Sequence, residues 1–277
     1  MKLEFDYLIA GGGSAGCALA SRLCEDKSIT VCIVEAGGNG NNLFIKMPAG
    51  NGFVFGNPKL DWGYKSIPQK NLNNRTIYFP RGKSLGGSSI VNGMIYMRGI
   101  PSDYDSWRQL GLNGWGYSDI LPYFKKSEGS EHRNDKYHGN KGPLKIERSS
   151  NYGILEEAFI KSAVKAGHKS IDDFNGSERT GVSRLDSTVS NGVRQSSAIS
   201  YLKKKPDNLT ILTHQQISKL LINKTDVVGL ETLKGTKVYC KREVIICQGA
   251  FGTPHLLMLS GIGPADHLIE NDINPII

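Results

Sequence analysis

The chain has 277 residues, a hydrophobic fraction of 39% and a charged fraction of 22%, which is an ordinary composition for a globular protein with a sizeable core. The net charge is +8, but the longest basic run is KKK at 203–205, with no interleaved aromatic residues, so no nucleic-acid partner is predicted. No apolar run approaches the ~20 residues of a membrane span, and no signal-peptide pattern opens the chain. We therefore expect a cytoplasmic protein without an integral membrane segment.

Cysteine and histidine patterns indicate neither disulfides nor a metal site. The five cysteines are odd in number and form no C-x-x-C pair, so we interpret them as small buried hydrophobic residues in a reducing compartment. No H-x-x-x-H or H-E-x-x-H pair occurs, and no metal ligands are predicted.

The N-terminal region has the order of elements of a dinucleotide-binding unit. Residues 5–10 read as a buried strand, GGGSAG at 11–16 as a glycine turn, and 17–26 as a helix. A second strand over 29–35 ends at Glu35. Strand, G-x-G-x-x-G turn, helix, strand and terminal acid form the dinucleotide fingerprint.

Each residue of this fingerprint has a physical task. Gly11 permits the tight turn, Gly13 lets the backbone approach a pyrophosphate, and Gly16 lets the helix pack close to the strand. The helix N-terminus offers N–H groups and a partial positive charge to phosphates. Glu35 is placed to accept ribose hydroxyls and would repel a 2′-phosphate, which argues against NADP. This unit alone does not separate NAD from FAD.

Beyond residue 40, turn signals and hydrophobic periodicity predict a mixed α/β chain. Residues 40–80 read as an irregular excursion, and strands dominate near the C-terminus, with a turn at Asn223-Lys224. Helices are predicted around Trp107, at 121–124, over 153–168 with an amphipathic pattern and over 253–261; strands are predicted over 209–214, 217–224, 227–233, 237–240 and 243–250.

The segment PRGKSLGGSSIVNGMIYMRG, residues 80–99, is rich in glycine and lacks Asp, Glu, His and Cys. Together with DYLIAGGGSAGCALASRL, VEAGG and GAFGTPHLLMLSGIGP, it resembles the glucose–methanol–choline (GMC) family of flavin oxidoreductases, most of all its choline dehydrogenase-like branch. The resemblance covers essentially the whole chain. It implies an α/β fold: an FAD-binding Rossmann-like domain (1–150 and 205–277), an additional antiparallel sheet, and the beginning of a GMC substrate domain (151–204).

The resemblance implies FAD as cofactor, with residues 80–99 running along the flavin. Such a segment needs no reactive side chain because the chemistry belongs to the cofactor. It has no His or Cys to form a covalent link, so non-covalent FAD is predicted. The fingerprint and the resemblance together assign to the FAD site Gly11, Gly13, Ser14, Ala15, Gly16, Glu35, Ala36, Arg81, Gly82, Ser84, Gly86, Gly87, Ser88, Asn92, Gly93, Met94, Ile95, Ile217 (by its backbone, to adenine) and Gly249.

The activity implied by the resemblance is oxidation of a CH–OH donor, by hydride transfer from a small choline-like alcohol to flavin N5. The family's catalytic His pair is expected downstream of residue 277, so no residue here is predicted to be catalytic. His132 and His138 lie in a charged stretch and are expected to face solvent, whereas His255 is expected to open a helix. We interpret the chain as an N-terminal fragment cut through a folding unit.

Three alternatives stay open at this point. The chain could be a catalytically inactive FAD-binding module, a cyanohydrin lyase on the same scaffold, or an NAD-dependent dehydrogenase. The glycine-rich segment 80–99 argues against the last of these. The expected partners are a small alcohol and either an electron acceptor or the missing C-terminal half.

Overall fold

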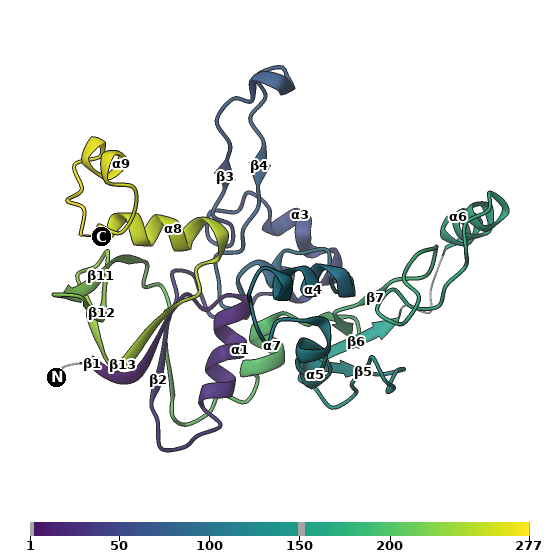
Figure 1. The fold of residues 1–277 in the computed structure, drawn as a ribbon, viewed down its shortest axis with the longest axis horizontal. Coiled ribbons are helices and arrows are strands. Elements are labelled where there is room, and N and C mark those ends of the chain that lie inside the picture. Colours follow the sequence, from purple (N-terminus) through teal and green to yellow (C-terminus); the bar gives the residue numbers. More distant parts are fainter. Residues whose placement is uncertain (1–2, 149–152, 277) are drawn as a thin grey trace. The chain divides into compact units, whose positions relative to one another are not determined.

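The computed structural model describes residues 3–148 and 153–276. The chain divides into two compact units, Met1–Asn92 with Ser196–Ile277, and Gly93–Gln195. Figure 1 follows the chain through both.

These units are defined by the compactness of the chain, whereas the predicted domains are defined by the ligand that each is expected to bind, FAD or substrate. The predicted boundary at 150/151 lies outside the described residues. The second unit ends at Gln195, and a short helix over Ser197–Leu202 separates that residue from the predicted boundary at 204/205. The assignment of 151–204 to a substrate domain therefore stays a prediction.

A six-stranded sheet forms the centre of the first unit, in the order β10-β2-β1-β13-β12-β11. Its strands are β1 Leu3–Ala10, β2 Val31–Val34, β10 Leu209–Leu212, β11 Ile217–Asn223, β12 Asp226–Thr232 and β13 Lys237–Ile246. β1 pairs in parallel with β2 and β13, whereas β12 pairs antiparallel with β11 and β13. The two strands predicted over 237–240 and 243–250 are one strand that ends at Ile246, before the predicted end. The turn at Asn223-Lys224 is confirmed.

The sheet buries both faces, which explains the continuous apolar runs of its parallel strands. Successive residues of a strand point to opposite faces. Leu8 of β1 belongs to one hydrophobic cluster with Leu256, and the next residue, Ile9, belongs to another with Ala20 of the first helix. The dinucleotide turn therefore follows a strand that is anchored on both sides.

Helices and short strands complete the first unit. They are α1 Ser14–Leu23, α2 Leu43–Lys46, α3 Asn51–Val54, β3 Tyr64–Lys65, β4 Tyr78–Phe79, α7 Ser197–Leu202, α8 Gly249–Leu259 and α9 Ala265–Glu270. α7 lies beside α1 (Figure 1). The prediction that α8 begins at 253, with His255 opening it, is wrong. The helix starts at Gly249 and continues through Pro254, because a proline removes one backbone hydrogen bond without necessarily ending a helix.

The prediction that the five cysteines are small buried residues is confirmed for three of them. Cys17, Cys24 and Cys32 are buried, but Cys240 and Cys247 are only partly buried, and all are free thiols. Burial raises the pKa of Cys17 and of Cys32 to about 12. These two side chains therefore act as small core residues and not as nucleophiles.

The second unit is built from short elements. They are α4 Pro101–Gln109, α5 Tyr117–Ser127, β5 Glu128–Ser130, β6 Leu144–Arg148, α6 Ile154–Lys165, β7 Asp186–Ser187, β8 Val189–Ser190 and β9 Val193–Arg194. β6 pairs in parallel with β5 and antiparallel with β7, and β8 forms a hairpin with β9. The two helices predicted within 102–128 are confirmed as α4 and α5.

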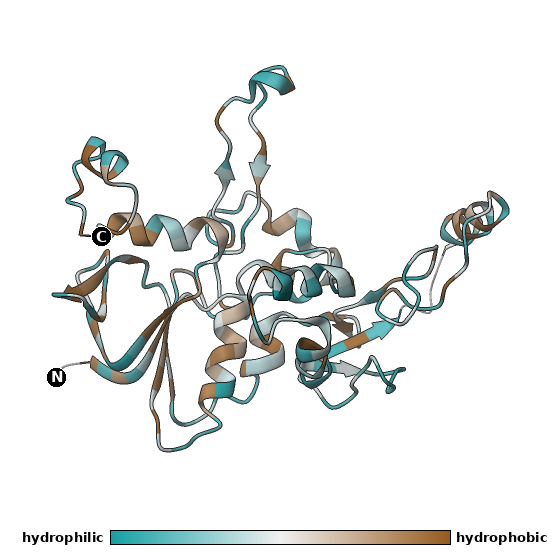
Figure 2. Ribbon diagram, viewed as in Figure 1, coloured by the Kyte–Doolittle hydropathy of each residue, from teal (hydrophilic) through white to brown (hydrophobic). Residues whose placement is uncertain are grey.

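The amphipathic helix predicted over 153–168 is confirmed as α6, but its apolar side chains are not buried in this chain. Ile154 is 89%, Leu155 82% and Phe159 70% exposed (apolar residues are brown in Figure 2). α6 therefore adds little to the packing of the second unit. Within the described part of the chain, no helix is long and apolar enough to cross a membrane.

Candidate dinucleotide-binding site

The turn between β1 and α1 is made by glycines that cannot carry a side chain. Gly11 has a φ of +101°, and a Cβ there would lie 2.8 Å from the Cys247 carbonyl oxygen. A Cβ on Gly16 would lie 2.1 Å from the Gly11 carbonyl oxygen. The tight turn and the close approach expected of these glycines are therefore present.

The N-terminus of α1 is open on the side expected to face a ligand. The N-cap is Gly13, and no side chain makes a capping hydrogen bond there. Ser14 and Ala15, in the first turn, are exposed. The aligned peptide dipoles give this end a partial positive charge, so it suits a phosphate group.

The second glycine-rich segment docks directly on this turn. The Gly86 N–H donates to the Gly12 carbonyl oxygen at 2.8 Å. Gly87 has a φ of +51°, and a Cβ there would lie 2.6 Å from the Gly13 Cα. Gly82 packs in turn against Gly87, because a Cβ on Gly82 would lie 2.2 Å from the Gly87 carbonyl oxygen. The two segments meet backbone to backbone, which only glycine permits.

Glu35 lies just after β2 and ties the turn to the following loop. Its side chain is buried, with Oε2 accepting from the Gly12 N–H and Oε1 from the Gly37 N–H, both at 2.8 Å. Burial raises the pKa of this carboxyl, while the N–H groups of Gly37 and Gly12 and the charge of Lys83 act in the opposite direction. A carboxylate oxygen can accept more than one hydrogen bond, so the group can also accept from a hydroxyl; its assignment to a ribose stays a prediction.

The loop after Glu35 pairs with the segment that begins at Arg81. A Cβ on Gly37 would lie 2.0 Å from the Lys83 carbonyl oxygen. Ser84 Oγ donates to the Gly38 carbonyl oxygen at 2.9 Å, and the Leu85 N–H donates to the same oxygen at 2.9 Å. Gly37 was not among the predicted site residues; its position in VEAGG, two residues after Glu35, is the signal that could have shown it.

The remaining predicted site residues fall in both compact units. Ala36, Arg81, Ser88, Asn92, Ile217 and Gly249 belong to the first unit, and Gly93, Met94 and Ile95 to the second. Gly249 has a φ of +74°, and a Cβ there would meet no described atom within 4 Å. In the second unit, the Met94 carbonyl oxygen accepts from the Thr188 N–H at 2.8 Å. Their assignment to a flavin site stays a prediction.

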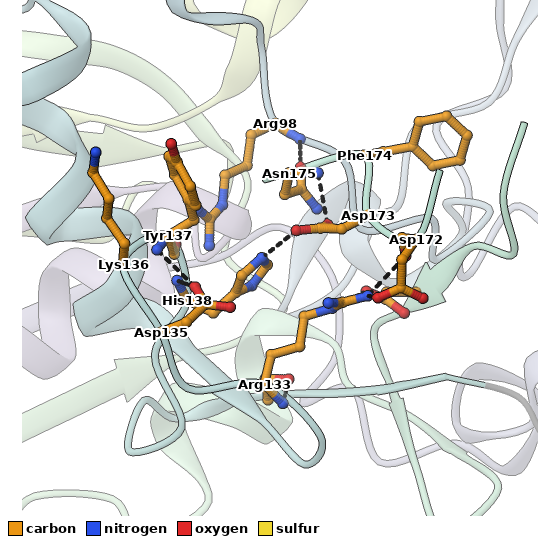
Figure 3. Close-up of polar contacts among 12 residues, drawn as sticks. Arg98, Arg133, Asp135, Lys136, Tyr137, His138, Asp172, Asp173, Phe174 and Asn175 are labelled. Atoms are coloured by element: carbon orange, nitrogen blue, oxygen red, sulfur yellow. Dashed lines mark hydrogen bonds and ion pairs between the residues drawn. The ribbon is translucent and has the colours of Figure 1, made fainter. Parts of the chain in front are cut away.

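A buried network of charged side chains in the second unit was not foreseen (Figure 3). His138 Nδ1 lies 2.8 Å from Glu128 Oε1. Its Nε2 lies 2.8 Å from Asp173 Oδ2, the contact that Figure 3 shows. Arg98 donates to Glu128 Oε2 at 2.6 Å, and its backbone N–H donates to Asn175 Oδ1 at 2.8 Å. The imidazole of His138 is thus hydrogen-bonded to two carboxylates, and Arg98 pairs with one of them.

The expectation that His138 faces solvent is wrong. Its side chain is 1% exposed, whereas His132 is exposed as expected. The charged residues around His138 in the sequence suggested a solvated loop. Its carboxylate partners are 10 and 35 residues away, so local polarity could not indicate that they pair inside.

The network makes the stability of the chain depend on pH. Burial alone would lower the pKa of His138, but hydrogen bonds to Asp173 and Glu128 outweigh it and raise the pKa to about 9 from 6.5. Burial would raise the pKa of Asp173, but its hydrogen bonds with His138 and the Asn175 N–H lower it to about 2 from 3.8. His138 thus stabilises fully below pH 6.5 and loses this contribution as the pH rises through about 9.

We expect the unfolding temperature, followed by circular dichroism, to fall as the pH rises through about 9. Asp173 adds an acid limit: its contribution is present above pH 3.8 and lost as the pH falls through about 2. The variant His138→Gln should lack the alkaline decline. A wild-type unfolding temperature that stays constant through the alkaline range would contradict the raised pKa of His138.

The turn, the open helix end, the buried acid and the docked glycine segment define a Rossmann-like dinucleotide-binding protein. The GMC oxidoreductase family model matches residues 5–276. The chain therefore belongs to the GMC oxidoreductase family, which confirms the resemblance and the expected fold class.

Known relatives and solved structures agree with this family. The chain is 42% identical to an oxygen-dependent choline dehydrogenase of Rhizobium etli over 98% of this chain and 50% of that protein. Pyridoxine 4-oxidase from Mesorbium loti is 34% identical, with a TM-score of 0.93 over 99% of this chain and 55% of that one. A mutant of Aspergillus oryzae formate oxidase, studied for FAD modification, is 32% identical, with a TM-score of 0.91 over 100% of this chain and 51% of that one. The chain spans about half the length of the proteins it matches.

Proposed function

We propose that this chain is the FAD-binding half of an FAD-dependent oxidoreductase that acts on CH–OH donors. A small, choline-like alcohol is the proposed substrate of the whole protein, because the curated relatives with which this chain shares 42–43% identity are choline dehydrogenases. The observation that supports the proposal best is the docking of Gly86 and Gly87 on the turn at Gly12 and Gly13. A nicotinamide site needs the turn but not the second glycine segment.

The residues present fit FAD. The uncapped N-terminus of α1 is suited to the pyrophosphate, and Glu35 to the adenosine ribose. The open space at Gly249 leaves room for a bound group beside the start of α8. When bound, FAD supplies the hydride acceptor at flavin N5. The chain itself binds and orients the cofactor, and backbone N–H groups of 80–99 would stabilise negative charge on a reduced flavin.

Further parts of the proposal come from the family resemblance. The backbone at Ile217 is proposed to contact adenine, and Gly93, Met94 and Ile95 to face the flavin. Attachment is proposed to be non-covalent because 80–99 has no His or Cys; FAD modification in a formate oxidase variant makes this a point to measure. A cytoplasmic location stays a prediction from the sequence.

A second candidate is an FAD-binding module without activity of its own. It is favoured by the chain spanning about half the length of its relatives. The cyanohydrin lyase alternative, on the same scaffold, differs from the proposed oxidoreductase because an alcohol would not reduce its flavin.

Anaerobic reduction of the bound flavin by choline separates the proposed oxidoreductase from both alternatives. The chain would be purified alone and after co-expression with the second half of a choline dehydrogenase relative. We expect choline to bleach the flavin absorption only in the co-expressed sample, with dithionite as the positive control in both. Bleaching of the chain alone would show that it holds its own catalytic groups. Absence of choline bleaching in both samples, with dithionite bleaching both, would contradict choline oxidation.

A further inference from the structure

Asp61 is a buried carboxylate without an assigned role. Its side chain, on a residue that is 3% exposed, accepts four hydrogen bonds. Oδ1 accepts from the N–H groups of Gly63 at 3.0 Å and Arg81 at 3.1 Å. Oδ2 accepts from the Gly56 N–H at 2.9 Å and from the Tyr78 hydroxyl. Every one of these donors is neutral, so the buried charge is satisfied by oriented dipoles.

These bonds join the irregular excursion to the start of the second glycine segment. The Trp62 N–H donates to the Arg81 carbonyl oxygen at 2.9 Å, and the Lys83 N–H donates to the Leu60 carbonyl oxygen at 2.8 Å. Lys83 Nζ lies 4.8 Å from the centre of the Trp62 ring. The stretch around Asp61 and the stretch Arg81–Lys83 are therefore paired through backbone and side chains alike.

From this pairing the chain runs directly onto the dinucleotide turn. Lys83 already contacts Gly37, and the Gly86 N–H bonds to Gly12. A Cβ on Gly82 would lie 2.2 Å from the Gly87 carbonyl oxygen. Since backbone atoms touch at each step, a shift at Arg81 has no space in which to be absorbed before it reaches Gly87.

We infer that Asp61 is a positioning residue for the cofactor site: by holding the Arg81 N–H, it fixes where Gly82–Gly87 lies against the Gly11–Gly13 turn. This rests on the proposed FAD site. Asp61 does not itself touch the turn. It sets the outer end of the segment whose inner end forms one wall of the proposed site.

The test is Asp61→Asn, which keeps the shape but replaces one acceptor oxygen with an NH₂ group that faces N–H or O–H donors. The control is Asp226→Asn, at the exposed turn between β11 and β12. We expect Asp61→Asn to speed hydrogen exchange of the apo-protein amides at 81–87, measured by mass spectrometry. It should also weaken FAD binding, measured by flavin fluorescence, by at least about tenfold. The control should change neither.

Unchanged exchange at 81–87, or faster exchange with unchanged FAD affinity, would overturn the inference. If Asp61→Asn does not fold, Tyr78→Phe removes one donor and keeps the carboxylate; about threefold weaker FAD binding is then expected, and wild-type affinity would overturn the inference. If the wild-type chain binds no FAD, the proposed function fails, and the exchange measurement still decides whether Asp61 fixes the segment.

Discussion

Replacing Gly87 with alanine is expected to abolish FAD binding and to lower the free energy of unfolding by roughly 2–4 kcal/mol. The new Cβ would lie 2.6 Å from the Gly13 Cα, where the neighbour is backbone and cannot rotate away. The φ of +51° adds left-handed strain for any residue with a side chain. Relief of both requires the segment to move off the turn, which opens the proposed site. Urea unfolding and FAD titration measure the two effects.

Gly52→Ala is the matched control for this prediction. Gly52 lies in α3, outside the left-handed region, and a Cβ there would meet no described atom within 4 Å. Alanine there should be neutral or stabilise by up to about 1 kcal/mol. Gly87→Ala with wild-type FAD affinity would show that the contact between the two glycine segments is not part of the site.

His138→Gln is expected to lower the free energy of unfolding by about 3–5 kcal/mol near neutral pH. The imidazole is hydrogen-bonded to both Glu128 and Asp173, and all three side chains are largely buried. Glutamine carries no charge and cannot reach both carboxylates in the same geometry. The variant therefore leaves Asp173 without its imidazolium partner, while Glu128 keeps only its ion pair with Arg98.

His168→Gln is the control, because His168 is exposed and follows α6 in the same compact unit. Its effect should stay within about 0.5 kcal/mol. Urea unfolding of both variants gives the comparison. Equal stability of His138→Gln and His168→Gln would mean that the buried pairs contribute no more than a solvated histidine.

The dinucleotide turn could be predicted because its parts are local in sequence. Gly11, Gly16 and Glu35 lie within one strand–helix–strand unit, and each was predicted from its spacing in the sequence relative to the two strands and the helix. The family resemblance placed Gly87 beside the flavin, but its contact with Gly13 was not predicted, since no local pattern links residues that far apart. The structure adds the atomic contact that explains why both are glycine.

The charged centres were missed for a common physical reason. Asp61 and His138 both sit in irregular stretches where polar residues usually face solvent, and their partners come from other loops. Burial of a charge depends on long-range pairing, which neither composition nor periodicity contains. The exposed apolar side of α6 shows the opposite case, because its amphipathic pattern predicts a helix but not what, in this chain, would cover it.

The visible absorption spectrum of the purified, dialysed chain tests the central claim most directly. Two glycine segments in backbone contact, an open helix end and an oriented acid should retain FAD without a covalent link. We predict a yellow protein with the absorption bands of oxidised flavin, whose cofactor is released into the supernatant on acid precipitation. A folded, colourless chain that gains no flavin bands on incubation with FAD would contradict the account.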